Sequence, residues 1–371
     1  MMISTGSNPT LTRTLLVGML GATLLMPHRA AAQMPRVGAT SDDAAALLSW
    51  IQQLPDRSDT RVISGQHLGF GEGVAGGYER FVAQLQASSG SLVALVGADY
   101  GYGKQWTEAA GRWDLIGKTN PTLIAHADAG GLVMVSWHAT NPWTGRSAWD
   151  NGPDDDLRAL VDPSNPMRAV WLAELDRVAA ALENLQDNGV VVLWRPFHES
   201  TGGWFWWGSR THPGNTQPFK ALWRDMHDYF TRVWGLDNLL WVYAAAESSL
   251  ANTIAPDANY PGADVVDIVG ESHYRVGSGT KVAPAGYAAL TALGKPYMLT
   301  EFGPDLQTPT GTYRYVRLAR RIRKRYPLII GWYSWGNGAS NSALRAIVSN
   351  RGPRRLFKDP WVIDATELDW R

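Results

Sequence analysis

The chain has 371 residues, of which 18 are tryptophan and none is cysteine, and its 34 basic side chains balance 34 acidic ones. The lack of cysteine excludes disulfides, thiolate metal sites and a cysteine nucleophile, and a net charge of zero gives no indication of a nucleic-acid partner. Eighteen tryptophans exceed what a core of this size needs, and a cluster of exposed indole faces is typical of a binding surface.

Residues 1–32 have the features of a secretory signal peptide. Arg13 supplies the positive charge, an apolar run extends from Leu15 to Met26, and Ala30-Ala31-Ala32 forms a small-residue cleavage pattern. The run is shorter than the roughly 20 residues that span a membrane; a buried first helix is the alternative. We therefore expect a secreted or periplasmic mature chain of residues 33–371, with no membrane-spanning segment.

Eight short apolar runs rich in β-branched residues follow along the mature chain. They are Arg61–Ser64, Leu92–Gly97, Leu132–Trp137, Val190–Arg195, Asn238–Tyr243, Val265–Gly270, Pro296–Leu299 and Leu328–Trp335. Amphipathic stretches separate most of them, and the clearest are Tyr78–Gln86, Met167–Gln186, Phe219–Val233, Tyr287–Leu293 and Tyr313–Arg325. No linker divides the sequence, so residues 33–371 are expected to form one domain.

Eight successive βα units without a linker predict an α/β fold, a (β/α)8 TIM barrel. The alternative is a doubly wound open sheet, which carries a glycine-rich phosphate turn after its first strand. Here Gly65-Gln66-His67 follows the first run instead, which favours the barrel. In a barrel, side chains just past the C-terminal ends of the strands line the active site.

Polar and aromatic side chains gather at these predicted strand ends. The third run ends at Trp137-His138, and the fourth continues through Arg195 and His198-Glu199 into Gly-Gly-Trp-Phe-Trp-Trp-Gly. The tryptophans at these ends are Trp137, Trp204, Trp206, Trp207, Trp332 and Trp335. Because sugars stack their apolar faces on indole rings, we expect a polysaccharide cleft here. For Trp143 and Trp149, in the loop after the third run, lining the cleft and packing are equally open.

Glu199 and Glu301 close the fourth and seventh predicted strands and can face each other across the barrel. Hydrolysis of a glycosidic bond with retention uses two carboxyl groups about 5–5.5 Å apart, one as acid and one as nucleophile. The aromatic neighbours of Glu199, Phe197 and Trp204, are expected to raise its pKa, while Arg195 and His198 can keep Glu301 ionised. Two other glutamates occupy similar positions and compete with these two, namely Glu247 and Glu271.

The segment from Trp194 to Gly208, in which His198-Glu199 precedes Gly202-Gly203-Trp204-Phe205-Trp206-Trp207-Gly208, resembles the signature of glycoside hydrolase family 26. That family is best known for endo-β-1,4-mannanases. Other segments resemble the family in the same order along roughly residues 44–368: Ser64-Gly65-Gln66-His67, Ser136-Trp137-His138, Thr300-Glu301-Phe302-Gly303 and Trp332-Tyr333-Ser334-Trp335-Gly336-Asn337.

The resemblance implies a retaining enzyme that cleaves internal β-1,4-mannosidic bonds of mannan or galactomannan, with Glu199 as acid/base and Glu301 as nucleophile. It implies that further residues bind substrate, namely His138, His198, Trp204, Tyr274 and Trp335, the last as the platform under the sugar at −1. The sequence departs from the family at Ser200-Thr201 and at Ser272, where aspartate is common, which leaves linkage and subsite preference open.

Three other functions remain to be weighed. The same chemistry could act on mixed-linkage β-glucan or β-1,3-xylan, or the barrel could bind glycans without catalysis. A metal-dependent hydrolase is also conceivable, but no His-x-His or His-Glu-x-x-His spacing is present. We expect no metal or cofactor, a polysaccharide substrate as the partner, and a monomer.

Overall fold

The computed structural model describes residues 40–59, 61–101, 113–152, 155–274, 282–306, 308–337 and 344–371. The predicted signal peptide, residues 1–32, lies outside the described residues. None of the helices in these ranges is long and apolar enough to cross a membrane.

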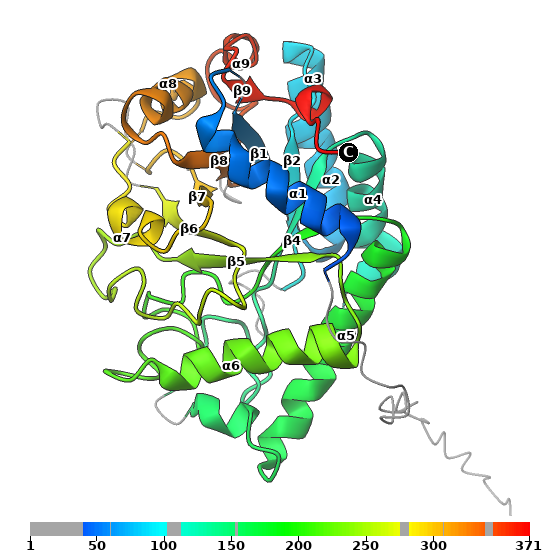
Figure 1. Ribbon diagram of the computed structural model, residues 1–371, viewed down its shortest axis with the longest axis vertical. Helices are drawn as coiled ribbons and strands as arrows, with labels where there is room; N and C mark the ends of the chain where they lie inside the picture. The colour runs from blue at the N-terminus through cyan, green and yellow to red at the C-terminus, as the bar shows by residue number, and fades with distance from the viewer. Residues whose placement is uncertain are drawn as a thin grey trace, which may run out of the picture. The chain divides into compact units, whose positions relative to one another are not determined.

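Eight parallel strands form a closed barrel (Figure 1). They are β1 (Val62–Phe70), β2 (Leu95–Asp99), β3 (Leu132–Ser136), β4 (Val192–Arg195), β5 (Leu239–Ala245), β6 (Ile268–His273), β7 (Tyr297–Phe302) and β8 (Ile329–Ser334). Each strand pairs with the next, and β1 pairs with both β2 and β8, which closes the sheet. A ninth strand, β9 (Val362–Ile363), pairs with the first two residues of β1. The predicted (β/α)8 TIM barrel is confirmed.

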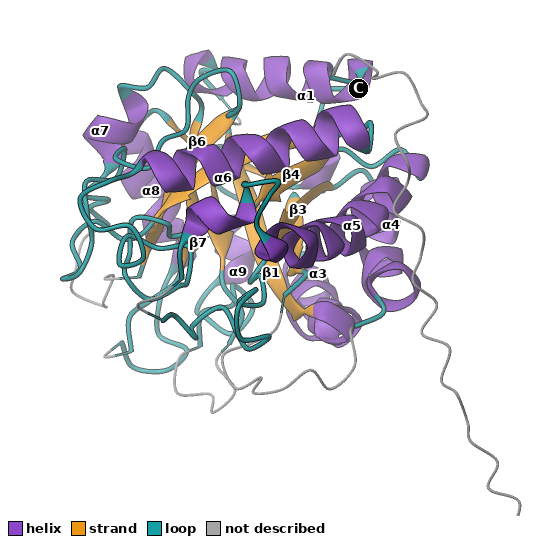
Figure 2. Ribbon diagram, turned by 90° about the horizontal axis from the view of Figure 1, so that it is seen from below, coloured by secondary structure: helices purple, strands orange, loops and turns teal. Residues whose placement is uncertain are grey.

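Helices connect the strands and lie outside the barrel (Figure 2). They are α2 (Val74–Tyr78) and α3 (Gln84–Ser89) after β1, α4 (Asn120–Asp128) after β2, α5 (Pro166–Asp187) after β3, α6 (Gln217–Asp228) after β4, α7 (Tyr287–Thr291) after β6, α8 (Tyr315–Arg325) after β7 and α9 (Pro353–Leu356) after β8. Short π-helical turns join α2 to α3 and extend α6 to Val233. Residues 246–267, between β5 and β6, contain no helix.

Helix α1 (Asp42–Gln53) precedes the barrel and packs against the inward-facing residues of its strands. It begins at Ser41, whose side chain accepts a hydrogen bond from the Ala44 amide and so caps the helix. Leu47 and Ile51 on its buried face pack against these inward-facing strand residues. The lumen is therefore filled with side chains rather than open.

Successive residues of each strand point to opposite faces, and this divides the core in two. Inward-facing residues such as Leu95 and Leu193 form one cluster with α1, the lumen cluster. Their neighbours Val96 and Trp194 pack against the outer helices and form a second cluster, the outer cluster. On the inward row of β2 and β4, the last residues are Asp99 and Arg195 instead of apolar side chains. The barrel thus has a polar end at the carboxyl termini of its strands.

Five strands end later than the sequence predicts, β2 and β5 by two residues each and the other three by more. β1 continues to Phe70, β6 to His273 and β7 to Phe302. Glycine interrupts the apolar pattern in β1, yet it is required there, because a Cβ on Gly65 would lie 2.4 Å from the Trp332 carbonyl oxygen. Glu301 consequently belongs to β7 rather than to the loop after it.

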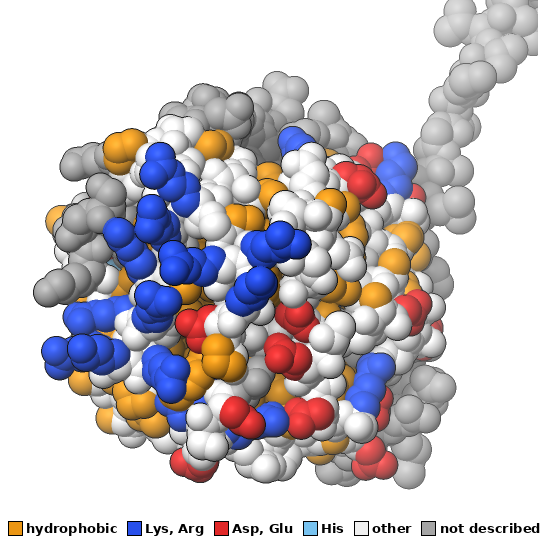
Figure 3. Space-filling view, turned by 90° about the horizontal axis from the view of Figure 1, so that it is seen from above, with side chains coloured by type: hydrophobic (Ala, Val, Ile, Leu, Met, Phe, Trp, Pro, Cys, Tyr) orange, Lys and Arg blue, Asp and Glu red, His pale blue; other side chains and the backbone are white. Residues whose placement is uncertain are grey.

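Lysine and arginine side chains gather on one part of the molecular surface (Figure 3). The neighbouring helices α8 and α9 both expose several basic side chains. They are Arg317, Arg320, Arg323, Lys324 and Arg325 on α8, and Arg354 and Arg355 on α9. The zero net charge of the chain therefore conceals a strongly basic face.

Candidate active site

Polar side chains of β2, β3 and β4 lie side by side at the carboxyl end of the lumen. Asp99 is opposite Ser136 in the β2–β3 register, and Ser136 is opposite Arg195 in the β3–β4 register. Arg195 is fully buried, and its Nε donates to Ser136 Oγ at 2.9 Å. This bond aims the guanidinium across the barrel toward β7.

Glu301 faces the lumen because of a bulge in β7. Leu299 lies opposite Glu271, but Ser272 lies opposite Glu301, so β7 contributes Thr300 as an extra residue. Leu299 belongs to the outer cluster, and strict alternation would have turned Glu301 outward with it.

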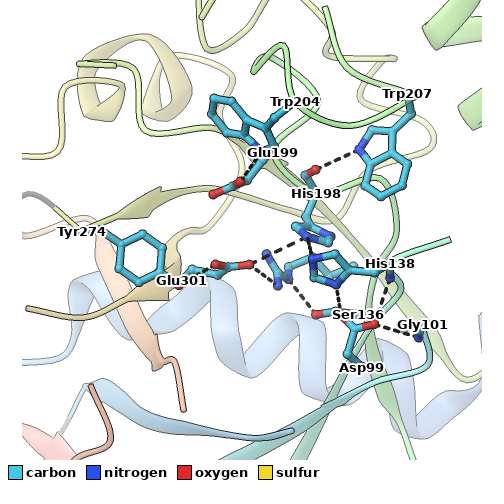
Figure 4. A network of polar contacts seen from close by, with 11 residues as sticks. Asp99, Gly101, Ser136, His138, His198, Glu199, Trp204, Trp207, Tyr274 and Glu301 are labelled. Carbon is cyan, nitrogen blue, oxygen red and sulfur yellow. Dashed lines mark hydrogen bonds and ion pairs between the residues drawn. The ribbon is translucent and has the colours of Figure 1, made fainter. Parts of the chain in front are cut away.

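Both carboxylate oxygens of Glu301 have a donor (Figure 4). Arg195 Nη2 donates to Oε1 at 2.7 Å, and the Tyr274 hydroxyl donates to Oε2 at 2.6 Å. His198 Nε2 lies 4.0 Å from Oε1. Arg195 thus supplies the countercharge, as the sequence suggested, and Tyr274 fixes the orientation of the carboxylate.

Glu199 stands on a tight turn directly after β4. Phe197 and Glu199 have φ angles of 46° and 55°, a region that non-glycine residues rarely adopt. The turn is held from two sides, because the Glu199 amide donates to the Ala244 carbonyl at 2.7 Å and the Trp207 indole to the His198 carbonyl at 2.9 Å. Such strain is typical of functional sites, and here it directs the Glu199 side chain into the cleft.

Burial and the nearby charge of Glu301 raise the pKa of Glu199 to about 7. The Trp204 indole opposes this shift by donating to Glu199 Oε2 at 2.8 Å. Phe197, expected to raise this pKa, points away into the outer cluster. The environments of the two glutamates therefore differ as an acid and a nucleophile require.

A chain of buried side chains joins β2 to Glu301 (Figure 4). Asp99 lies 2.6 Å from His138 Nδ1, and His138 Nε2 lies 3.1 Å from His198 Nε2. Burial, with His138 and Arg195 nearby, lowers the pKa of His198 well below its ordinary value. Sequence reasoning missed Asp99, although an acidic residue closing an apolar strand was a usable signal.

The two glutamates line one cleft of about 770 Å³ together with all five predicted substrate-binding residues. These five are His138, His198, Trp204, Tyr274 and Trp335. Residues that the sequence did not single out complete the lining, including Phe205, Asp305, Leu306 and Arg345.

The prediction that six tryptophans at the strand ends form the cleft was wrong for four of them. Only two of the six line it, whereas the others are buried in the outer cluster, namely Trp137, Trp206, Trp207 and Trp332. For Trp137 and Trp332 the reason is that side chains alternate along a strand, whereas Trp206 and Trp207 lie in the loop after β4.

The open question about Trp143 and Trp149 has a divided answer. Trp149 lines the cleft and stacks on His138, with ring centroids 4.8 Å apart. Trp143 instead packs edge-on against Trp206. Trp335 rests on His67, a β1 residue whose ring lies 3.7 Å away and within 5° of parallel.

The competing glutamates have other partners. Glu271 faces away from the lumen, where it accepts hydrogen bonds from the Tyr297 hydroxyl at 2.9 Å and from the Gly286 amide. Glu247 lines the cleft, but its Oε2 accepts from the Tyr274 amide at 3.0 Å and so holds the backbone there. Across the described ranges, no group of three or more His, Asp or Glu side chains is placed to hold a metal ion.

Comparison with known proteins finds one matching family and several similar structures. The sequence profile of glycosyl hydrolase family 26 matches residues 38–367. Mannan endo-1,4-beta-mannosidase of Bacillus subtilis (strain 168) is 30% identical over 365 residues, which are 94% of this chain and 92% of that protein. Among solved structures, Bacillus subtilis mannanase BCman has a TM-score of 0.78 at 29% identity, covering 90% of this chain and 95% of that one. Bacillus subtilis mannanase man26 has a TM-score of 0.75 at 27% identity, covering 89% and 94%.

Proposed function

Because the chain belongs to glycosyl hydrolase family 26, we propose that it is an endo-β-1,4-mannanase that cleaves internal bonds of mannan or galactomannan with retention. The names of its relatives support the substrate. The observation that carries the mechanism is the pairing of two unlike carboxyl groups in one cleft: Glu199, with a pKa raised to about 7, and the ion-paired Glu301.

In the first step, a carboxylate oxygen of Glu301 forms a bond to the anomeric carbon while the bond to the leaving oxygen breaks. Glu199 gives its proton to that oxygen, so the leaving chain departs as a neutral alcohol. The new bond removes the negative charge of Glu301, which had helped to raise the pKa of Glu199. The pKa of Glu199 is therefore lower at this stage than in the free enzyme, which stabilises the deprotonated form that results.

In the second step, Glu199 accepts a proton from water, and the water oxygen attacks the anomeric carbon. The ester to Glu301 breaks and its carboxylate returns to Arg195 and Tyr274, the two donors that fixed its position before. Glu199 regains its proton, so the charge of the cleft after a turnover is the same as before it.

We assign the glycan-binding surface to Trp204 and Trp335, two of the three indole rings that line the cleft, and to its polar lining. Trp335 offers its face as a platform and is supported from behind by the parallel ring of His67. Trp204 stands beside Glu199, on the side where the leaving sugar must lie. His138 and His198 line the cleft beside these rings and offer it their ring surfaces.

We further propose that residues 1–32 are a signal peptide and that residues 33–371 form the mature, secreted or periplasmic enzyme. The charge of Arg13, the apolar run to Met26 and the alanines before Gln33 support this proposal. Amino-terminal sequencing of the exported protein is expected to begin at Gln33; a start at Met1 would contradict it.

A substrate panel tests the proposed activity. Mannan, galactomannan, lichenan and β-1,3-xylan are compared under one condition, with Glu301→Gln as an inactive control that keeps the shape of the side chain. We expect mannans to be cleaved fastest, with a ladder of oligosaccharides that shows internal cleavage and with the β-anomer as the first product. Preferred cleavage of lichenan or xylan, or a first product of inverted configuration, would overturn the proposal.

A further inference from the structure

We propose that Asp99 is a positioning residue for the reaction, acting through His138 and His198 to keep an N–H, and not a lone pair, on the ring nitrogen of His198 that lies near Glu301. Asp99 is completely buried and does not line the cleft, so it cannot touch substrate. The inference rests on the proposed function, because it concerns the same nucleophile, but its first readout does not depend on any substrate.

Each polar contact of the Asp99 carboxylate is with a group that can donate a hydrogen bond to it. Its Oδ1 accepts from the backbone amides of Gly101 at 2.8 Å and His138 at 2.9 Å, and its Oδ2 faces His138 Nδ1 at 2.6 Å. Three donors converge on this carboxylate, and two of them are backbone amides that cannot accept a hydrogen, so the contacts favour its ionised form. An ionised carboxylate has no proton to give, and His138 Nδ1 must therefore carry the hydrogen.

The position of the ring hydrogen on His138 determines the position of the ring hydrogen on His198. In neutral His138, a hydrogen on Nδ1 leaves Nε2 as an acceptor, and the only ring nitrogen facing it in the described network is His198 Nε2 at 3.1 Å. His198 Nε2 must then be the donor. The opposite tautomer of His198 would set two lone pairs against each other and would leave a hydrogen on Nδ1, which is buried without a partner among the described residues.

The result is a neutral donor beside the nucleophile. The hydrogen on His198 Nε2 bonds to His138 at 3.1 Å, and this polar N–H lies 4.0 Å from Glu301 Oε1, on the side of the carboxylate that Arg195 also holds. Asp99 has a second effect, since it is a buried anion close enough to stabilise the charge of Arg195. When Glu301 becomes an ester and loses its charge, Asp99 remains to balance the guanidinium.

Replacement of Asp99 by asparagine is expected to reverse the direction of the hydrogen bonds from residue 99 through His138 to His198. An amide nitrogen facing His138 Nδ1 donates, so His138 carries its hydrogen on Nε2 and His198 must accept there. His198 then presents a lone pair instead of a donor toward Glu301. By analogy with other enzymes in which a buried aspartate orients a histidine, we expect kcat to fall by roughly 10²- to 10⁴-fold in Asp99→Asn, with little change in oligosaccharide affinity.

The experiment reads the tautomers directly by ¹⁵N NMR of histidine-labelled protein at pH 7. In the wild type we expect hydrogen on Nδ1 of His138 and on Nε2 of His198, and in Asp99→Asn the reverse. The matched control is Asp267→Asn, which changes an acceptor of the Trp241 amide on the residue before β6, away from the carboxyl end of the lumen. We expect it to preserve both tautomers and kcat.

Several outcomes would overturn the proposal. In the wild type, an imidazolium at His138 or a hydrogen on Nδ1 of His198 would refute it, and this measurement remains even if Asp99→Asn fails to fold. Reversed tautomers in Asp99→Asn with unchanged kcat would also refute it. If the wild-type enzyme instead cleaves no mannan while its tautomers are as expected, the substrate assignment fails and the positioning chain stands.

Discussion

The Trp204 indole donates to Glu199 at 2.8 Å and thereby opposes the burial that raises the pKa of this carboxyl group. Trp204→Phe removes that donor. A bond worth about 1 kcal/mol corresponds to a rise of about 0.7 in the pKa of Glu199. Because the acid must be protonated, the basic limb of the kcat/KM profile should move to higher pH. A shift to lower pH would contradict this role for Trp204.

The second prediction concerns the coupling between the two glutamates. In the wild type, a pKa of about 7 at Glu199 means that kcat/KM falls as the pH rises through about 7. Glu301→Gln removes the negative charge that raises this pKa, so the Glu199 carboxyl should titrate at lower pH. The measurement is a ¹³C NMR titration of Glu199 in both proteins, and an unchanged midpoint would show that burial alone sets the value.

Glu271 is predicted to serve stability and not catalysis, because its carboxylate faces away from the lumen. Glu271→Ala leaves the Tyr297 hydroxyl and the Gly286 amide without an acceptor, which costs about 1–3 kcal/mol of unfolding free energy. We expect urea denaturation to show this loss while kcat on mannan stays within a few-fold. A folded variant without activity would return Glu271 to the candidates for nucleophile.

The ring of His67 is predicted to support the sugar platform. His67→Ala removes the parallel ring beneath Trp335. Aromatic pairs contribute about 0.5–1.5 kcal/mol, so KM should rise between about two- and tenfold while kcat is largely kept. His67→Phe retains a flat ring and is expected to restore KM. If His67→Phe is as poor as His67→Ala, stacking is not what His67 supplies.

The basic face over α8 and α9 predicts retention on a cation exchanger at pH 7 in spite of the zero net charge. Lys324→Glu with Arg354→Glu should release the protein at lower salt than the wild type, because the binding charges lie together. The control pair, Arg158→Glu with Arg232→Glu, makes the same change in net charge elsewhere on the surface. Equal effects of the two pairs would show that only net charge matters.

Much of the fold could be predicted because its signals are local. Eight apolar runs separated by amphipathic stretches sufficed for the barrel, and five predicted helical stretches coincide with helices, among them α5 and α8. Strand ends were less accurate, because residues such as Gly65 interrupt the pattern for reasons that lie in a neighbouring strand.

The site was partly predictable for the same reason. Glu199 and Glu301 stand near strand ends and so could be found, whereas the burial of Trp206 and Trp207 depends on how a loop folds back over the outer helices. Asp99 was missed because its importance comes from a partner, His138, that is distant in sequence. Pairings of this kind are decided by strand register, which no local pattern reports.

The bulge at Thr300 decides on which face of β7 the carboxylate of Glu301 lies. With Thr300 bulged between Leu299 and Glu301, the carboxylate faces the cleft, whereas regular pairing of the same three residues would turn it toward the outer helices. Deletion of Thr300 would remove the bulge, and Glu301 would then directly follow the outward-facing Leu299 and still turn inward, one residue closer to the start of β7. The face that Glu301 occupies is therefore set by how β7 pairs with its neighbours, and a substitution that straightens this strand would displace the carboxylate without altering it.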